Sequence, residues 1–134
     1  MKNSFLQKVY YSDTDAYGVV WHGSYLRWLE MGRVNLCEDV GYSLVKMAKE
    51  NIVLPVVEIN IRYKSSAMLE ETLFIETELL ESSRTSMTFL QKISNNDTKK
   101  LRVDAKVKVV ATSNDGILYR NLPDALVDFI NKVK

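Results

Sequence analysis

The sequence predicts an α+β fold in which a curled antiparallel β-sheet wraps around one long central α-helix. Two observations predict it. A long, largely apolar helical stretch follows Gly23, and beyond Asn51 apolar and polar residues alternate with a period of two. Such alternation is typical of antiparallel strands with one buried and one solvated face. A right-twisted sheet buries that face most simply by curling around the helix.

The first third of the chain is expected to supply one strand and two helices. Residues 5–11 end in a β-rich run and stop at Ser12, which predicts a first strand. A helix is predicted from Ser24 to about Glu38, and its apolar residues cover so much of its surface that other structure should wrap it on most sides. Its narrow polar stripe consists of Arg27, Glu30, Arg33 and Glu38. After Gly41, Ser43 is the expected N-cap of a shorter helix through Lys49.

The rest of the chain reads as sheet, followed by one terminal helix. Four strands are expected near residues 57–64, 73–79, 87–93 and 103–109, joined by turns rich in Ser, Asn and Asp. The turn Asn114-Asp115-Gly116 precedes a last short strand at 117–119. Pro123 opens a helix with Leu126, Phe129 and Ile130 on one side.

Length and charge bound the function. With 134 residues, the chain fits a single domain over 1–134. Its 18 basic and 17 acidic residues nearly cancel, so the sequence lacks the excess of positive charge that is typical of nucleic-acid-binding proteins. One cysteine, no signal-peptide pattern and no apolar run of about 18 residues indicate a cytoplasmic protein with no membrane insertion. The unpaired edge of a half-solvated sheet predicts a homo-oligomer.

The loop at residues 13–23 holds the candidate chemistry. It places Asp13, Asp15 and the only histidine, His22, directly before the long helix, whose start exposes unpaired N–H groups and the positive end of a dipole. Gly18 lets the loop double back, and Gly23 leaves those N–H groups approachable. A carboxylate facing such an oxyanion hole is a minimal acyl-transfer site, in which Asp15 attacks a carbonyl or activates water. His22 can orient the carbonyl or handle a proton.

Each of these residues also has a structural interpretation. An Asp-x-Asp in a loop more often satisfies local N–H groups, and a lone His is often only a hydrogen-bonded structural residue. Cys37 falls on the apolar helix and is expected in the core rather than as a nucleophile. Trp21 and Tyr25 flank the loop and either pack or meet a substrate. No convincing metal-ligand set occurs.

The run from Tyr11 to Tyr25, followed by Glu30 and Arg33, resembles the signature of the hotdog-fold acyl-CoA thioesterases. Within them it is most similar to the 4-hydroxybenzoyl-CoA thioesterase and YbgC-like branch. The segment 62–67, Arg-Tyr-Lys-Ser-Ser-Ala, resembles the matching strand end of that family. The order of strand, helix and sheet agrees over nearly the whole chain.

The resemblance implies a hotdog domain, a homodimer or a homotetramer built of dimers, that hydrolyses an acyl-CoA to a free acid and CoA. Asp15 would be the nucleophile or general base, His22 would assist, and the N–H groups of His22 and Gly23 would polarise the thioester carbonyl. The acyl group would enter a pocket at the dimer interface, without metal or redox cofactor. Candidates for the CoA phosphates are Arg62, Lys64 and Arg84, although exposed basic residues are usually only a solvated face.

Two other functions remain open at this point. The same fold can hydrate or dehydrate an acyl thioester, and it can serve as a non-catalytic acyl-CoA binding module. Nothing in the sequence chooses among short-chain, longer aliphatic and aromatic acyl groups, or between CoA and an acyl carrier protein.

Overall fold

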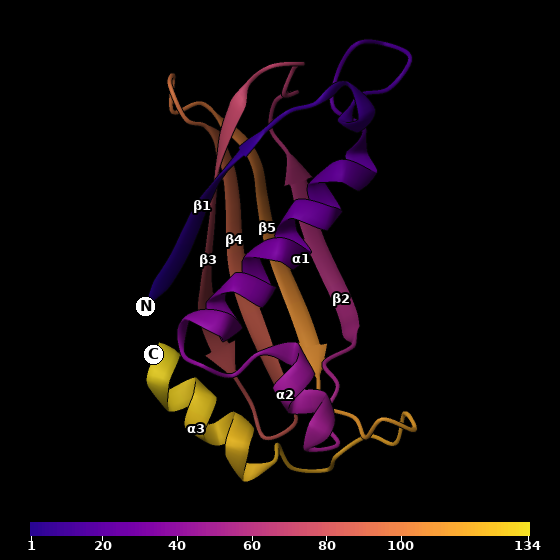
Figure 1. Ribbon diagram of the computed structural model, residues 1–134, viewed down its shortest axis with the longest axis vertical. Coiled ribbons are helices and arrows are strands. Elements are labelled where there is room, and N and C mark those ends of the chain that lie inside the picture. The colour runs from indigo at the N-terminus through magenta and orange to yellow at the C-terminus, as the bar shows by residue number, and fades with distance from the viewer.

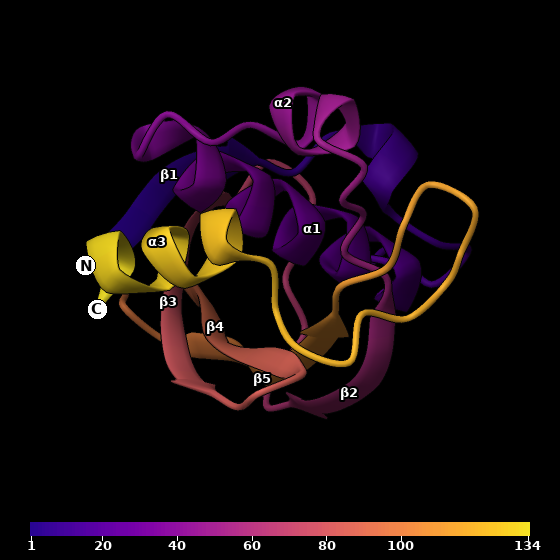
Figure 2. The same cartoon turned by 90° about the horizontal axis from the view of Figure 1, so that it is seen from below.

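The computed structural model describes all residues, 1–134, and shows one antiparallel sheet with a long helix across its inner face (Figure 1). The strands are β1 (Lys2–Lys8), β2 (Val56–Tyr63), β3 (Thr72–Ser82), β4 (Ser86–Asn95) and β5 (Leu101–Val110). Their order in the sheet is β1-β3-β4-β5-β2, so β1 and β2 are the edges. Seen from below, the sheet curls around helix α1 (His22–Asp39), as the sequence predicted (Figure 2). No helix is both long enough and apolar enough to cross a membrane.

Helix α1 buries one side and exposes the other. Trp28, Leu29 and Leu36 are fully buried against the inner face of the sheet. Leu26 and Met31, however, are each 37% exposed. The expectation that other structure wraps the helix on most sides is therefore wrong for the single chain. The sheet covers only the side that faces it, and an apolar strip is left uncovered.

A buried polar cluster fixes the middle of α1 on the sheet. The amide of Gln91 in β4 donates hydrogen bonds to the Leu29 carbonyl (2.8 Å) and to the Thr77 hydroxyl (2.7 Å). Arg33 donates to the Gln91 amide oxygen at 3.0 Å. Gly32 lies directly over this cluster, because a Cβ at that position would be only 2.3 Å from the Thr77 Oγ1. The helix thus approaches the sheet at a position where no side chain fits.

The two remaining helices close the far end of the sheet. Helix α2 (Leu44–Lys49) begins as predicted, with the Ser43 hydroxyl accepting a hydrogen bond from the Lys46 N–H. Helix α3 (Asp124–Val133) follows Pro123, and Leu126, Phe129 and Ile130 are buried on one side of it. These side chains pack in one apolar cluster with Leu36 of α1 and Phe89 of β4.

Two predicted strands differ from the structure. The first strand runs over Lys2–Lys8, since β3 extends far enough to pair with all of it, from Lys2 opposite Glu78 to Lys8 opposite Thr72. Residues 11–13 instead form a 3-10 turn, in which the Asp13 carboxylate accepts the Tyr10 N–H. The predicted strand at 117–119 is only an isolated bridge between Leu118 and Thr112, because the turn at Gly116 (φ 85°) leads out of the sheet.

Replacing Gly32 with Ala should destabilise the fold despite the better helix propensity of Ala. The added methyl group meets Thr77, which is fully buried and cannot move aside. Overpacking of this kind costs about 1–3 kcal/mol, against about 1 kcal/mol gained in propensity. Urea unfolding measures the difference, with Glu38→Ala on the exposed side of the same helix as control. A Gly32→Ala protein as stable as the parent would show that the contact is not tight.

Candidate active site

The loop before α1 is a tight excursion that doubles back on itself. Thr14 and Val20 form an antiparallel bridge, and the Asp15 N–H donates to the Val19 carbonyl at 2.9 Å. The reversal needs Gly18, whose φ of 80° lies in the left-handed region that other residues rarely adopt. Gly18 therefore performs the role predicted from the sequence.

The two carboxylates of the loop differ in how many of their oxygens accept hydrogen bonds. Asp13 is buried, and its two oxygens accept from the Tyr10 N–H and the Arg27 guanidinium. Asp15 is half-buried, and only its Oδ1 is engaged, by the N–H groups of Tyr17 (2.8 Å) and Val19 (3.4 Å). Its Oδ2 accepts no hydrogen bond. Asp13 is thus a structural residue, whereas Asp15 combines a turn-forming role with one free oxygen.

The sequence predicts Arg27 on the polar stripe of the helix but does not indicate its partner. It pairs with a carboxylate 14 residues earlier in the chain. The Asp13 backbone carbonyl also accepts the Trp21 N–H (2.8 Å) and the Ser24 hydroxyl (3.0 Å). Together these contacts tie the start of α1 to the loop.

The start of α1 presents free hydrogen-bond donors. The helix begins at His22, its N-cap residue Trp21 makes no side-chain capping bond, and no acidic residue occupies the first turn. The backbone N–H groups of His22 and Gly23 have no acceptor within the protein. This is the uncapped, positive end of an 18-residue helix, a place where a developing negative oxygen is stabilised.

Trp21 and His22 lie at the mouth of this site. The Trp21 ring covers Gly23, since a Cβ there would be 2.1 Å from the ring atom Cζ3. The ring is half exposed, and its centroid lies 5.1 Å from that of His22. The His22 imidazole makes no hydrogen bond to the protein and is exposed. The space that the missing side chain of Gly23 leaves, expected to keep the helix start approachable, is thus taken by the Trp21 ring, while the His22 imidazole stays exposed beside it.

Tyr25 is buried and supports the loop from behind. Its ring is 3% exposed, and its hydroxyl accepts the Ala67 N–H at 2.9 Å. Burial is the main reason that its pKa is raised, although the hydrogen bond from Ala67 opposes the shift. The Ala67 carbonyl accepts the Val20 N–H at 3.0 Å. Of the two interpretations given for Tyr25, packing is the one that the geometry favours.

The three basic residues expected at the CoA phosphates lie in two different places. Arg62 is exposed on the outer face of β2, opposite Asp104, and Lys64 follows the same strand. Both are at the end of the sheet where α1 begins. Arg84 lies in the β3–β4 turn beside α3, at the other end of the molecule (Figure 1). Helix α1, which runs between these two ends, is roughly 27 Å long at 1.5 Å per residue. The structure thus does not bring Arg84 to the loop of its own chain.

An apolar pocket of about 240 Å³ opens between α1, α2 and the start of β2. Arg33 and Glu30 stand at its polar side, and burial is the main reason that the pKa of Arg33 is lowered. Cys37 is buried in the wall, and burial raises the pKa of its thiol to about 11, as expected for a core residue rather than a nucleophile. The apolar lining consists of Val34, Cys37, Leu44, Leu54, Val56, Phe89 and Val109.

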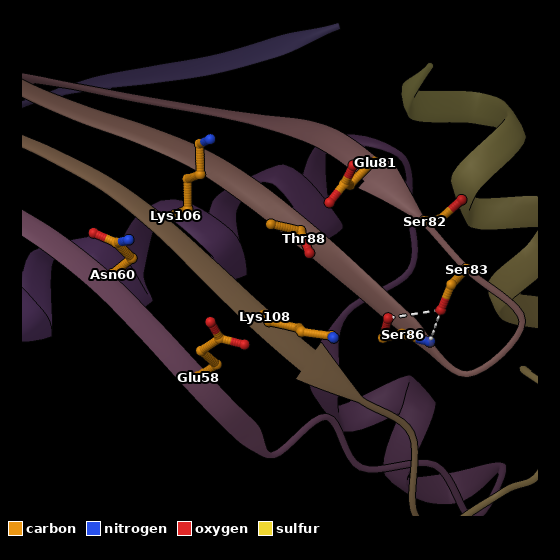
Figure 3. Close-up of a pocket in the computed structure, with 9 residues that line it drawn as sticks. All are labelled: Glu58, Asn60, Glu81, Ser82, Ser83, Ser86, Thr88, Lys106 and Lys108. Atoms are coloured by element: carbon orange, nitrogen blue, oxygen red, sulfur yellow. Dashed lines mark hydrogen bonds between the residues drawn. The ribbon is translucent and has the colours of Figure 1, made fainter.

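A larger hollow, of about 400 Å³, lies on the outer face of the sheet (Figure 3). Its nine lining residues are all polar or charged, with Lys106 and Lys108 among Glu58 and Glu81. An acyl group would find no apolar side chain there. No three His, Cys, Asp or Glu side chains lie close enough together to hold a metal ion.

Comparison with known proteins gives one family. Residues 9–130 match the model of the thioesterase-like superfamily. The chain is 33% identical over 120 residues to the acyl-CoA thioester hydrolase YbgC of Escherichia coli. The aligned region covers 90% of this chain and 89% of that protein. It is 31% identical over 122 residues to a putative esterase of Synechocystis, over 90% of this chain and 74% of that protein.

Solved structures share the fold over nearly the whole chain. A DHNA-CoA thioesterase from Staphylococcus aureus superposes with a TM-score of 0.87 at 25% identity, covering 98% of this chain and 90% of that one. The 4-hydroxybenzoyl-CoA thioesterase from Pseudomonas gives 0.85 at 24% identity, over 96% and 98%. The latter likeness shows the fold alone, and it confirms the predicted hotdog architecture.

Changing each carboxylate to its amide should separate the two roles of the loop aspartates. Asp13→Asn removes the charge that holds Arg27 and the Tyr10 N–H, and should cost about 1–2 kcal/mol of unfolding free energy. Asp15→Asn keeps an oxygen for the Tyr17 N–H, and should change stability by less than about 0.5 kcal/mol. Urea unfolding measures both. Equal losses would remove the distinction drawn between the two residues.

Proposed function

The chain belongs to the thioesterase-like superfamily, and from this membership and the site we propose that it hydrolyses acyl-CoA thioesters to a free acid and CoA. The observation that carries the proposal is the pairing, in one short loop, of an unoccupied Asp15 oxygen with the free N–H groups of His22 and Gly23. Carbonyl chemistry needs these two elements, one to drive attack on the carbon and one to stabilise the oxygen.

The proposed reaction begins with the thioester carbonyl oxygen at the start of α1. The Asp15 carboxylate attacks the carbonyl carbon, or takes a proton from a water that attacks it. As the new C–O bond forms, negative charge develops on the carbonyl oxygen, and the N–H groups of His22 and Gly23 stabilise it. When the carbonyl re-forms, the C–S bond breaks and CoA leaves as a thiolate, which takes its proton from Asp15 in the water route and from His22 or water in the direct route. His22 orients the carbonyl or handles that proton.

In the direct route, attack by Asp15 produces a mixed anhydride, and a water molecule then hydrolyses it to restore the carboxylate. Every group needed for either route is a side chain, a backbone N–H or water. We therefore assign the reaction no metal and no redox cofactor. The cytoplasmic location expected from the sequence stays a prediction.

We further propose that the working unit contains a dimer formed through β2. This strand is an edge, and Val56, Val57, Ile59 and Tyr63 on it are exposed. Its unpaired backbone groups invite pairing with an identical strand about a two-fold axis, which would also cover the exposed strip of α1. Light scattering coupled to gel filtration decides whether two such dimers form a tetramer.

Such a dimer would complete the site. Antiparallel pairing of two copies of β2 would bring the Val56 end of one strand close to the Tyr63 end of the other. Within one chain, the Tyr63 ring lies 5.6 Å from that of Tyr25, in the first turn of α1. The apolar pocket that Val56 lines would therefore face residues 13–23 of the other subunit, which we call the catalytic loop. We propose that it receives the acyl group, with Arg62 and Lys64 near the CoA phosphates.

Thiol release from acetyl-, hexanoyl-, palmitoyl-, benzoyl- and 1,4-dihydroxy-2-naphthoyl-CoA tests the activity and finds the preferred acyl class. Asp15→Asn should lower kcat by about 10²–10⁴-fold, because the amide neither attacks nor accepts a proton. Asp115→Asn, the same exchange in an exposed turn, serves as control and should match the parent. Undiminished turnover in Asp15→Asn would refute the assignment. Formation of a hydrated or dehydrated thioester without release of thiol would favour the hydratase or dehydratase reaction of this fold.

A charge on the edge strand should separate the subunits. Ile59→Lys puts an ammonium on the inner face of β2, beside the proposed partner strand, and should give a monomer with greatly reduced turnover. Asn60→Lys, next to it on the outer face, should remain a dimer with normal activity. Light scattering coupled to gel filtration measures the mass of each. A dimeric Ile59→Lys protein would place the interface elsewhere.

A further inference from the structure

The connection between β2 and β3, residues 64–71, is the surface on which the catalytic loop rests. Its Ala67 carbonyl accepts the Val20 N–H at 3.0 Å, and Met68 forms an antiparallel bridge with Val19. Its Ala67 N–H donates to the Tyr25 hydroxyl in the first turn of α1. The loop and the helix start therefore take their relative position from this connection.

One carboxylate holds the connection in shape from within. The Oε2 of Glu71 accepts the Met68 N–H at 2.6 Å, which closes a turn around Glu70. Glu70 has a φ of 73°, a left-handed conformation that residues other than glycine rarely adopt. Since such a backbone persists only where its surroundings enforce it, the turn depends on the contacts of Glu71.

The same carboxylate is anchored to the β4–β5 end of the sheet. Its Oε1 accepts from the Asn95 amide (2.8 Å) and from the Nη2 (2.9 Å) and Nε (3.2 Å) of Arg102. The Nη1 of Arg102 donates to the Ser65 hydroxyl at 2.9 Å, at the beginning of the connection. The side chains of Arg102 and Glu71 are only 11% and 14% exposed, so water screens the pair little. Arg102 thus binds both ends of the connection, Ser65 at its beginning and Glu71 at its end.

We propose that the Glu71–Arg102 pair is a positioning element of the active site, which acts on Asp15 through the β2–β3 connection. Neither residue touches the substrate in this proposal, which rests on the proposed thioesterase activity. Burial alone would raise the pKa of Glu71, but hydrogen bonds from Asn95, Arg102 and Met68 outweigh it and lower that pKa. The carboxylate therefore stays ionised while the enzyme works.

The test is Glu71→Gln, which keeps the size of the side chain but loses the charge and one of the acceptor oxygens. Misplacement of a reacting group by about 1 Å can cost about 100-fold in rate, so kcat should fall about 10- to 100-fold. KM should change less than about threefold, because no substrate contact is removed. Ser65→Ala, which removes one contact of Arg102 and the hydrogen bond that the Ser65 hydroxyl donates to the Leu101 carbonyl, should show the same split with a smaller loss.

A stability-matched control separates positioning from general destabilisation. Val133→Ala opens a cavity in α3, at the other end of the sheet, and should lower the unfolding midpoint while kcat stays within about twofold. Hydrogen exchange followed by mass spectrometry should show faster exchange of residues 13–21 in Glu71→Gln and Ser65→Ala, but not in Val133→Ala.

Unchanged kcat in both variants, or an equal loss of kcat in Val133→Ala, would overturn the proposal. If the parent protein releases no thiol, the proposed function fails. The exchange rates of residues 13–21 still decide in that case whether Glu71 holds the loop, and unchanged rates would overturn that part as well.

Discussion

The contact on which this structure depends is the packing of one side of α1 on the concave face of the sheet. Trp28, Leu29 and Leu36 lose all or nearly all of their exposed surface in that contact. Gln91 adds a direct bond to the Leu29 carbonyl, which is possible because Gly32 has no side chain. A helix held this closely has a fixed axis, so its first turn always lies at the same end of the sheet. The candidate chemistry is located at that first turn.

Two identical side chains, two positions apart, acquire different roles from this arrangement. Asp13 is occupied on both oxygens, and its backbone carbonyl also holds Trp21 and Ser24. Asp15 lies one step further along the excursion, where neighbouring N–H groups reach only one oxygen. The difference comes from the number and position of nearby hydrogen-bond donors rather than from the residue type. Because the second oxygen of Asp15 accepts no hydrogen bond from the protein, it is available for reaction.

Local signals in the sequence predicted much of the fold, while contacts between distant segments were not predictable. Ser43, Gly18 and Pro123 act at single turns and behaved as expected. The start of β1 depended on the length of β3, some 70 residues away. The placement of Arg84 depended on which end of the sheet a hairpin occupies. Glu71 and Arg102 gave no signal in periodicity or motif, since they meet only through the register of three strands. The apolar residues of α1 are evident in the sequence, but the sequence does not show that the sheet covers only one side of the helix and leaves Leu26 and Met31 partly exposed.

The central claim is that a thioester binds with its carbonyl oxygen at the start of α1 and its carbonyl carbon beside residue 15. A crystal structure of Asp15→Asn with its best acyl-CoA substrate tests this most directly. The account predicts the carbonyl oxygen within hydrogen-bond distance of the His22 and Gly23 N–H groups, with the acyl group in the apolar pocket of the other subunit. A thioester bound in the polar hollow on the outer face, or one whose carbonyl points away from the helix, would contradict it.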